Sequence, residues 1–332
     1  MRRFIFAGAA IAAVASSAPA AAQDVNWTGG YVGGRLGYAF GLDDNDEQIL
    51  FDTDLDGSFG DTVNTSLASD AFSPGFCGGS PESALAADGC NRDDDGIDYG
   101  VHAGYDYDFG TIVLGGLVEY GMSDVEDAVT AFSTTPANYA FNRKMRGTFG
   151  LRGRLGIDAG RFMPYVTAGM VRAKIRNSFT TSNGVNAFAL NQRSHSETGY
   201  RLGGGVETMV GPMAIGLLYL YTSVKDDGAR VAVTQGTAGA TNPFILVNPN
   251  GTAFRRSEDR FKVHALSLTA SYRFGGPAAS PPPPPPPPPA PPPTEAPPAT
   301  QTCSDGSVIL ATDACPTPPP PPPPPVPEPE RG

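Results

Sequence analysis

The feature that most constrains the fold is the alternation of polarity along residues 261–274. The even-numbered positions from His264 onward are mainly large and apolar, whereas the odd-numbered ones are small or polar and end on Arg273. Side chains two residues apart share one face of a β-strand, so this pattern predicts a strand with one apolar and one polar face. The segment is long enough for a tilted bilayer crossing and ends on the aromatic Phe274. We therefore interpret it as the closing strand of a transmembrane barrel.

Seven earlier segments are also predicted to be strands, most of them by the same alternation. The clearest is residues 98–109, where tyrosine and aliphatic residues at odd positions oppose glycine, His102 and Asp106 at even positions. Residues 162–174 alternate less cleanly, so we assign no faces there, and residues 213–224 are apolar on both faces. The eight predicted strands span residues 27–40, 98–109, 111–122, 146–157, 162–174, 199–210, 213–224 and 261–274.

The first residues are predicted to form an export signal. Arg2 and Arg3 precede an apolar run over residues 4–15, and three small residues at 20–22 form a cleavage site, so residues 1–22 are predicted to be a secretory signal peptide. No later segment reaches eighteen consecutive apolar residues, so no membrane-spanning helix is predicted in the mature chain. Because lipid offers no hydrogen bonds to free backbone groups, any membrane crossing must be a closed β-barrel.

The connections between the predicted strands are alternately long and short. The gaps after the second, fourth and sixth strands are tight turns, whereas those after the first, third, fifth and seventh are long. Outer-membrane barrels keep short turns in the periplasm and long loops outside the cell. The predicted fold is therefore all-β: an eight-stranded antiparallel transmembrane β-barrel over residues 23–274, with long extracellular loops and both chain ends in the periplasm.

Three motifs suggest a family. The glycine-rich start at residues 27–38, the Arg152–Gly153–Arg154 segment and the Tyr272–Arg273–Phe274 ending resemble the small porin-like, outer membrane protein A type barrels of alphaproteobacteria. The resemblance covers residues 24–274. It implies a location in the cell outer membrane, and it implies that Tyr272, Arg273 and Phe274 form the insertion signal recognised by the barrel-insertion machinery.

Residues 275–332 form a proline-dominated tail. Unbroken proline runs at 281–289 and 318–325 favour a disordered but stiff polyproline II spacer in the periplasm. Cys303 and Cys315 lie between the runs and are predicted to close a small disulfide knot. In the family that the chain resembles, a similar hinge precedes a peptidoglycan-binding domain, which implies partners near peptidoglycan. The sequence given ends at Gly332, where that domain would begin, and does not say whether the domain was lost by truncation.

The predicted inward faces carry charges of both signs. An eight-stranded barrel is about wide enough inside for its own side chains, so these charges should pair with one another. These charges have two possible roles. They could form a packed polar core that sets the strand register, or a gate in which exchange between ion pairs opens a narrow ion path. The predicted lumen ion-pair residues, with His102 nearby, are Arg35, Asp106, Glu119, Arg152, Arg154, Arg201 and Glu207.

Residues 41–97, the first long loop, hold most of the acidity. The loop contains 14 Asp and Glu residues against the single Arg92, whereas the whole chain has a net charge of −11. A charge balance of this kind excludes a nucleic-acid-binding surface, which needs basic patches. Divalent ions could bridge the acidity to lipopolysaccharide, and lipopolysaccharide and outer-membrane lipid are expected partners. Cys77 and Cys90 in the same loop are predicted to form a disulfide.

The acidic loop also contains the start of a calcium-loop pattern. Asp52, Asp54 and Asp56 are followed by Gly57, but the twelfth position is Val63 where the pattern requires a bidentate Glu. The alternatives are a weak calcium site and a solvated acidic loop.

These observations favour a structural outer-membrane barrel with an acidic surface loop and a periplasmic spacer. A small non-specific diffusion pore is the alternative. A membrane enzyme that modifies lipid is a second alternative, but it would need a serine or an acid paired with histidine at the barrel rim. We assign no such partner to His102, His195 or His264. The protein is therefore expected to have no catalytic residues and no cofactor.

Overall fold

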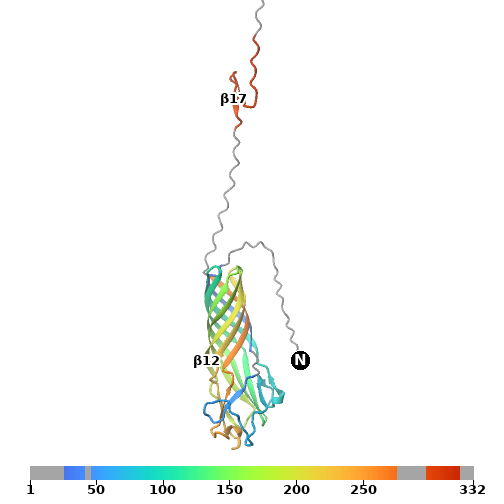
Figure 1. Cartoon of the computed structure of the whole chain (residues 1–332), viewed down its shortest axis with the longest axis vertical. Helices are drawn as coiled ribbons and strands as arrows, with labels where there is room; N and C mark the ends of the chain where they lie inside the picture. Colours follow the sequence, from blue (N-terminus) through green and yellow to red (C-terminus); the bar gives the residue numbers. More distant parts are fainter. Residues whose placement is uncertain (1–25, 42–45, 275–296, 322–332) are drawn as a thin grey trace, which may run out of the picture. The chain divides into compact units, whose positions relative to one another are not determined.

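The computed structural model describes residues 26–41, 46–274 and 297–321 (Figure 1). The predicted signal peptide at residues 1–22 and the proline run at residues 281–289 lie outside the described residues. Among the described residues, no helix has the length and apolar character needed to cross a membrane. The chain divides into two compact units, residues 1–279 and residues 280–332, which are considered separately.

The first unit is built on a closed antiparallel β-barrel of eight strands. The strand order is β10-β12-β13-β16-β1-β6-β7-β9, and pairing of β9 with β10 closes the ring. The eight strands correspond to those predicted from the sequence. Their bounds are β1 (Gly29–Phe40), β6 (Gly96–Asp108), β7 (Ile112–Ser123), β9 (Ala137–Ile157), β10 (Phe162–Thr181), β12 (Ser194–Val210), β13 (Met213–Lys225) and β16 (Arg260–Phe274).

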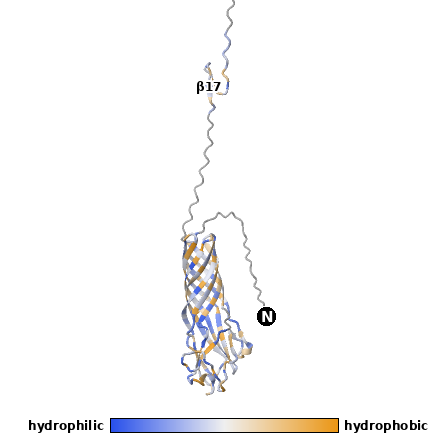
Figure 2. Cartoon of the chain, viewed as in Figure 1, coloured by the Kyte–Doolittle hydropathy of each residue, from blue (hydrophilic) through white to orange (hydrophobic). Residues whose placement is uncertain are grey.

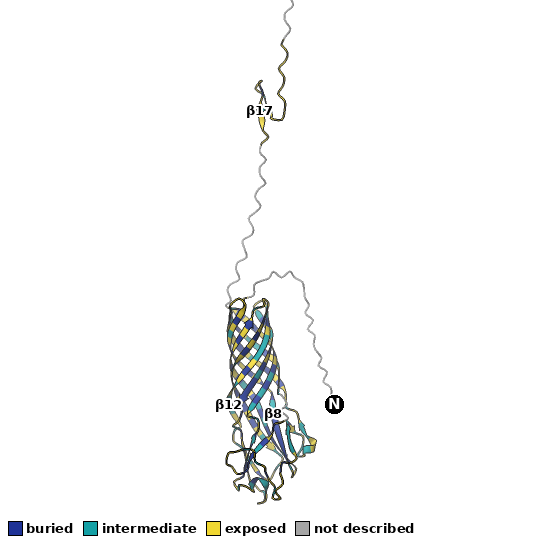
Figure 3. Ribbon diagram, viewed as in Figure 1, coloured by how far each residue is buried: buried dark blue, intermediate teal, exposed yellow. Residues whose placement is uncertain are grey.

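Buried and exposed residues alternate along each barrel strand (Figure 3). The exposed set is largely apolar and includes Leu36, Tyr105 and Leu268, whereas the inward-facing set is rich in charged residues and in glycines that are buried or half-buried. The hydropathy colouring shows the resulting checkered wall (Figure 2). On β10, whose faces the sequence left unassigned, Met163 and Tyr165 point inward and Val166 points outward. The wall is therefore polar inside and apolar outside, as a barrel in lipid requires.

The two ends of the barrel differ. Tight turns follow β6, β9 and β12 at one end, called here the short-turn end. Long connections follow β1, β7, β10 and β13 at the other end, called here the long-loop end. The strands β9 and β10 are longer than predicted, with 21 and 20 residues, because they continue past the barrel at the long-loop end. Their register shifts between Lys174 and Ile175, where the extension begins.

The long connections are not free loops. The strand β8 (Glu126–Ser133) pairs with the extension of β9, and β3 (Gly75–Gly78) pairs with β8. A separate four-stranded sheet joins β11 (Ala187–Leu190), β14 (Val231–Thr234), β15 (Thr252–Arg256) and β2 (Ile49–Asp52). We call these strands, with the extensions of β9 and β10, the loop region.

The loop region has its own hydrophobic core. Phe51, Phe72, Tyr139 and Phe244 pack around Phe254, which is fully buried. The ring centroids of Phe51 and Phe254 lie 4.9 Å apart, and those of Phe244 and Phe254 lie 5.4 Å apart. The acidic segment 41–97 contributes to this core through Phe51 and Phe72, so that part of the segment is packed rather than solvated.

The described part of the tail contains a small hairpin. The strands β17 (Thr300–Thr302) and β18 (Val308–Leu310) pair in antiparallel fashion. The Cys303–Cys315 disulfide closes the segment. The tail was predicted to be disordered apart from a disulfide knot, and the structure adds this hairpin to the knot.

Candidate functional site in the lumen and loop region

The barrel lumen contains a carboxylate held by three arginines. Glu119 on β7 accepts hydrogen bonds from Arg35 Nη1 at 2.7 Å, Arg201 Nη1 at 2.6 Å and Arg152 Nε and Nη2, both at 2.9 Å. Arg35 also donates through Nε to Asp98 at 2.8 Å. All five side chains are almost fully buried. Charge-assisted hydrogen bonds of this kind fix the relative positions of five different strands.

A second ion cluster lies closer to the short-turn end. Arg154 donates to Asp106 and, at 3.0 Å, to Glu207, while Arg273 Nη2 donates to Asp106 Oδ2 at 2.8 Å. The Arg154 and Arg273 guanidiniums also lie over the ring of Tyr31, at 4.6 and 5.1 Å from its centroid. The structure thus places all seven sequence-predicted lumen residues in two clusters. Sequence reasoning missed Asp98, and it treated Arg273 as part of an insertion signal rather than as a lumen cation.

Glycines make room for these long side chains. A Cβ added at Gly115 would lie 1.9 Å from Asp106 Oδ1, and one added at Gly121 would lie 2.3 Å from Arg35 Nη2. No side-chain atom fits at such a separation, so the glycines of the inward faces provide the volume that the arginines occupy.

Apolar side chains fill the lumen around the ion clusters. One group begins at the short-turn end and consists of Trp27, Val113, Met163, Tyr165, Ala214, Leu218 and Leu220. This group extends alongside the ion clusters, because Leu220 pairs in register with Gly203, which lies between Arg201 and Glu207 on β12. The apolar layer at the long-loop end consists of Ala39, Val125, Met145, Val171, Ala173, Ile175, Val224, Phe261, Val263 and Ala265. Paired charges and apolar side chains therefore share the lumen.

A third ion cluster joins the barrel to the loop region. Arg143 pairs with Asp127 at 2.7 Å, and Arg256 pairs with both Asp127 and Glu47 at 2.5 Å. Arg143 also lies 5.0 Å above the ring of Phe261, which belongs to the apolar layer at the long-loop end. Sequence reasoning missed this cluster because the predicted strand began only at residue 146, whereas β9 begins at Ala137. The alternation continues through Tyr139, Phe141 and Arg143, and this signal could have revealed the extension.

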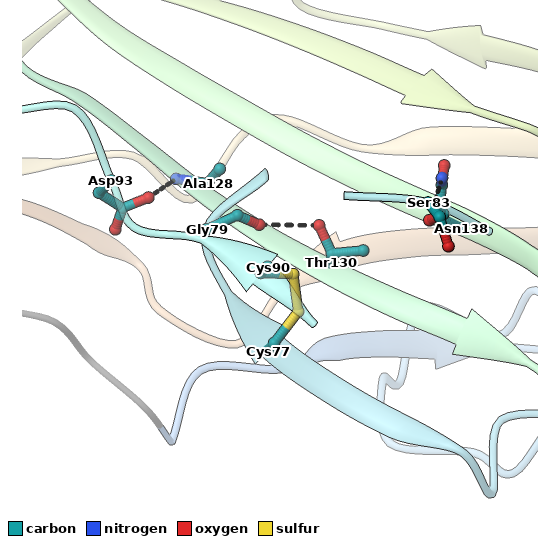
Figure 4. The surroundings of a disulfide bond; sticks show 8 residues. All are labelled: Cys77, Gly79, Ser83, Cys90, Asp93, Ala128, Thr130 and Asn138. Carbon is teal, nitrogen blue, oxygen red and sulfur yellow. Dashed lines mark hydrogen bonds between the residues drawn. A yellow bond between two sulfur atoms is a disulfide. The ribbon is translucent and has the colours of Figure 1, made fainter. Parts of the chain in front are cut away.

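Two carboxyl groups near this junction have shifted pKa values. Burial raises the pKa of Asp127, but the Arg256 and Arg143 guanidiniums outweigh burial and lower the pKa to about 2. Burial and the neighbouring Asp127 carboxylate raise the pKa of Asp93 to about 7. Asp93 accepts a hydrogen bond from the Ala128 amide at 2.8 Å, beside the Cys77–Cys90 disulfide (Figure 4). The junction therefore holds Asp127 as an anion, whereas the Asp93 carboxyl titrates near neutrality.

Each histidine has a polar neighbour. His102 Nε2 lies 2.8 Å from Ser271 Oγ, His195 Nε2 lies 3.0 Å from Asp226 Oδ1, and His264 Nδ1 lies 2.6 Å from the Tyr219 hydroxyl. The His102–Ser271 pair is buried inside the lumen, away from the barrel rim. Among the described residues, His102 contacts a serine but no acid, and His195 contacts an acid but no serine.

The acidic loop gathers three carboxylates, but not the set that the motif predicts. Oxygens of Asp52, Asp54 and Asp61 lie within 4.8 Å of one another. Asp56, the third acid of the motif, instead accepts a hydrogen bond from the Ser58 amide at 2.6 Å. Asp52 is only 3% exposed, and its Oδ1 has no hydrogen-bond partner among the described residues.

Comparison with known proteins identifies the family to which this architecture belongs. The model of the outer membrane protein beta-barrel domain matches residues 8–274. The chain belongs to this outer-membrane β-barrel family. It is also 30% identical over 214 residues to the 31 kDa outer-membrane immunogenic proteins of Brucella melitensis and Brucella suis, a match covering 63% of this chain and 76% of each relative. Family membership supports a location in the outer membrane and contact with its lipid.

Solved outer-membrane barrels also resemble this family member. The outer membrane protein OprG of Pseudomonas aeruginosa is 13% identical, with a TM-score of 0.42, and the match covers 76% of this chain and 99% of that one. Neisserial surface protein A is 13% identical, with a TM-score of 0.31, over 74% of this chain and 98% of that one.

Proposed function

We propose that this protein is a structural outer-membrane barrel with a closed lumen, which carries the loop region as a folded surface platform. The observation that carries the proposal is the filled lumen. Five buried arginines and four carboxylates pair with one another among packed apolar side chains. Such pairing supports the packed core over the gate and the diffusion pore, because opening a path would separate buried charges from their partners.

The same proposal assigns an orientation. The short-turn end would face the periplasm and the loop region the cell exterior, because outer-membrane barrels keep short turns inside. Residues 1–22 would be removed on export, and residues 275–332 would extend toward the cell wall as a spacer near peptidoglycan. The Tyr272–Arg273–Phe274 ending would be read by the insertion machinery before Arg273 enters its ion cluster. Lipopolysaccharide would surround the long-loop end.

Planar-bilayer recording tests the closed lumen. Purified, folded protein is expected to leave the current at the bilayer baseline, because paired charges and apolar side chains fill the lumen. Insertion must be verified in the same preparation by flotation with lipid vesicles and by the heat-dependent gel mobility of a folded barrel. Reproducible conductance steps that change in Glu119→Ala would overturn the proposal in favour of a gated pore.

The proposal also assigns no catalytic role. The buried His102–Ser271 pair has no acid on the other ring nitrogen among the described contacts, and its place within the packed lumen leaves no route for a lipid substrate. An unchanged lipid A composition after deletion of the gene is the expected result.

We further propose that the acidic loop binds a divalent cation weakly, through Asp52, Asp54 and Asp61. Hard oxygen ligands suit calcium, and Asp52 Oδ1 is buried without a hydrogen-bond partner among the residues that the structure describes. Calorimetric titration of the folded protein with calcium is expected to show uptake that Asp61→Asn abolishes. Asp56→Asn is the matched control and should leave uptake intact, because Asp56 lies outside the gathered set. Equal loss in both variants, or no uptake by the unmodified protein, would favour the solvated-loop alternative.

A further inference from the structure

A basic concavity lies on the outer wall of the barrel where its apolar surface ends. It has a volume of about 660 Å³ and is lined by residues of β7, β9, β10 and β12. Its apolar lining includes Tyr120, Met122 and Phe149, which all point outward and are exposed. The concavity is therefore continuous with the surface that faces lipid.

Four cations line the same concavity. Arg172, Lys174 and Arg176 alternate along β10 and are exposed on its outer face, and Arg146 on β9 lies next to the residue that pairs with Lys174. Among the described residues, none of the four has an ion-pair partner. Ser196 on β12, the register partner of Lys174, adds a hydroxyl to the lining. Four neighbouring cations without a carboxylate repel one another, so the cluster favours an anionic ligand.

The position of the cluster selects the kind of ligand. The next outward residue of β10 toward the short-turn end is Met170, which is 66% exposed and belongs to the apolar wall. The polarity of the wall thus changes between Met170 and Arg172. In a bilayer this change marks the boundary between acyl chains and headgroups. A lipid held there would place its chains on Tyr120, Met122 and Phe149 and its headgroup among the cations.

We propose that this concavity binds the anionic headgroup of a glycolipid of the outer leaflet. The guanidiniums and the Lys174 ammonium would bind its phosphate or other acidic groups, and the apolar lining would hold its acyl chains. The inference rests on the proposed orientation, which places the long-loop end at the outer leaflet. It goes beyond the general lipid contact of a membrane barrel because it names a specific site. Forked guanidiniums suit phosphate oxygens in particular.

Native mass spectrometry of the folded protein in detergent tests the site, with lipid A carrying two phosphates as the probe. Arg172→Gln, Lys174→Gln and Arg176→Gln together are expected to weaken lipid A binding by at least about tenfold, because each basic residue near a membrane surface contributes appreciably to binding of anionic lipid. Dephosphorylated lipid A with the same acyl chains should bind the unmodified protein about as weakly. Binding in detergent does not depend on orientation, which protease accessibility on cells tests separately.

Matched variants keep the test decisive. Lys225→Gln, Arg230→Gln and Arg255→Gln remove the same charge elsewhere at the long-loop end and should leave lipid A binding unchanged. Arg172→Lys with Arg176→Lys keeps the cations and should retain most of the binding. Heat-dependent gel mobility confirms that each variant is folded. Equal weakening in both triple variants, equal binding of dephosphorylated lipid A, or competition by millimolar inorganic phosphate alone would overturn the proposal.

Discussion

Glu119→Ala is expected to lower the free energy of unfolding of the barrel by about 3–5 kcal/mol. Glu119 is the shared acceptor of Arg35, Arg152 and Arg201, and all of these groups are buried. Removing the carboxylate leaves Arg152 and Arg201, which are both buried, without an ion-pair partner among the described residues. Urea unfolding in detergent micelles, followed by tryptophan fluorescence and by gel mobility, measures the loss.

Two further variants test whether the loss of stability comes from unpaired buried charge. Glu82→Ala removes an exposed carboxylate of the loop region and is expected to change stability by less than about 0.5 kcal/mol. Adding Arg152→Leu to Glu119→Ala removes one of the unpaired buried cations and should recover part of the lost stability. If Glu119→Ala is as stable as the unmodified protein, the lumen charges are solvated and the closed-lumen proposal fails with them.

Phe254→Ala is expected to destabilise the loop region by about 3–5 kcal/mol while leaving the barrel folded. Phe254 is fully buried, and its ring contacts those of Phe51, Phe72 and Phe244 among others. Truncation leaves a cavity at the centre of the aromatic core that packs the long connections together. Limited proteolysis should then cut the loop region quickly, whereas the heat-dependent gel mobility of the barrel persists.

Leu67→Ala is the matched control for this effect. Leu67 lies in the same acidic segment as Phe51, but its side chain is 87% exposed, so its removal should leave protease resistance unchanged. Loss of the folded gel form in Phe254→Ala would contradict the expectation, because it would mean that barrel and loop region unfold as one unit. Unchanged protease resistance would mean that the aromatic core does not hold the loops.

The barrel could be predicted because its signal is local. Alternation with period two reports which face of a strand meets lipid, and it is visible within a dozen residues, as along residues 98–109 and 261–274. The same alternation placed Arg35, Glu119 and Arg152 on inward faces. It could not say which acid each arginine would contact, because those partners are set by the register between strands.

The loop region was harder to predict. The four strands of its separate sheet are each four or five residues long, and they come from connections far apart in the chain. Phe51 pairs in register with Phe254, two hundred residues away, and neither neighbourhood alternates for long. The cluster of the Asp52, Asp54 and Asp61 carboxylates was missed for a related reason. The linear motif takes its ligands from fixed positions of one twelve-residue loop, whereas here the chain turns and brings Asp61 back beside the end of β2.

The sequence by itself determined that the chain forms a barrel of eight strands with an apolar outer wall and a charged interior. The physical reason is local, because apolar residues alternate with small or polar ones along most strands, according to whether they face lipid or the lumen. Only the tertiary structure decided which interior charges pair with one another and that the long connections share one core. Both outcomes depend on contacts between residues remote in sequence, such as the three arginines on Glu119 and the rings around Phe254. Contacts of this kind leave no periodic trace in the chain.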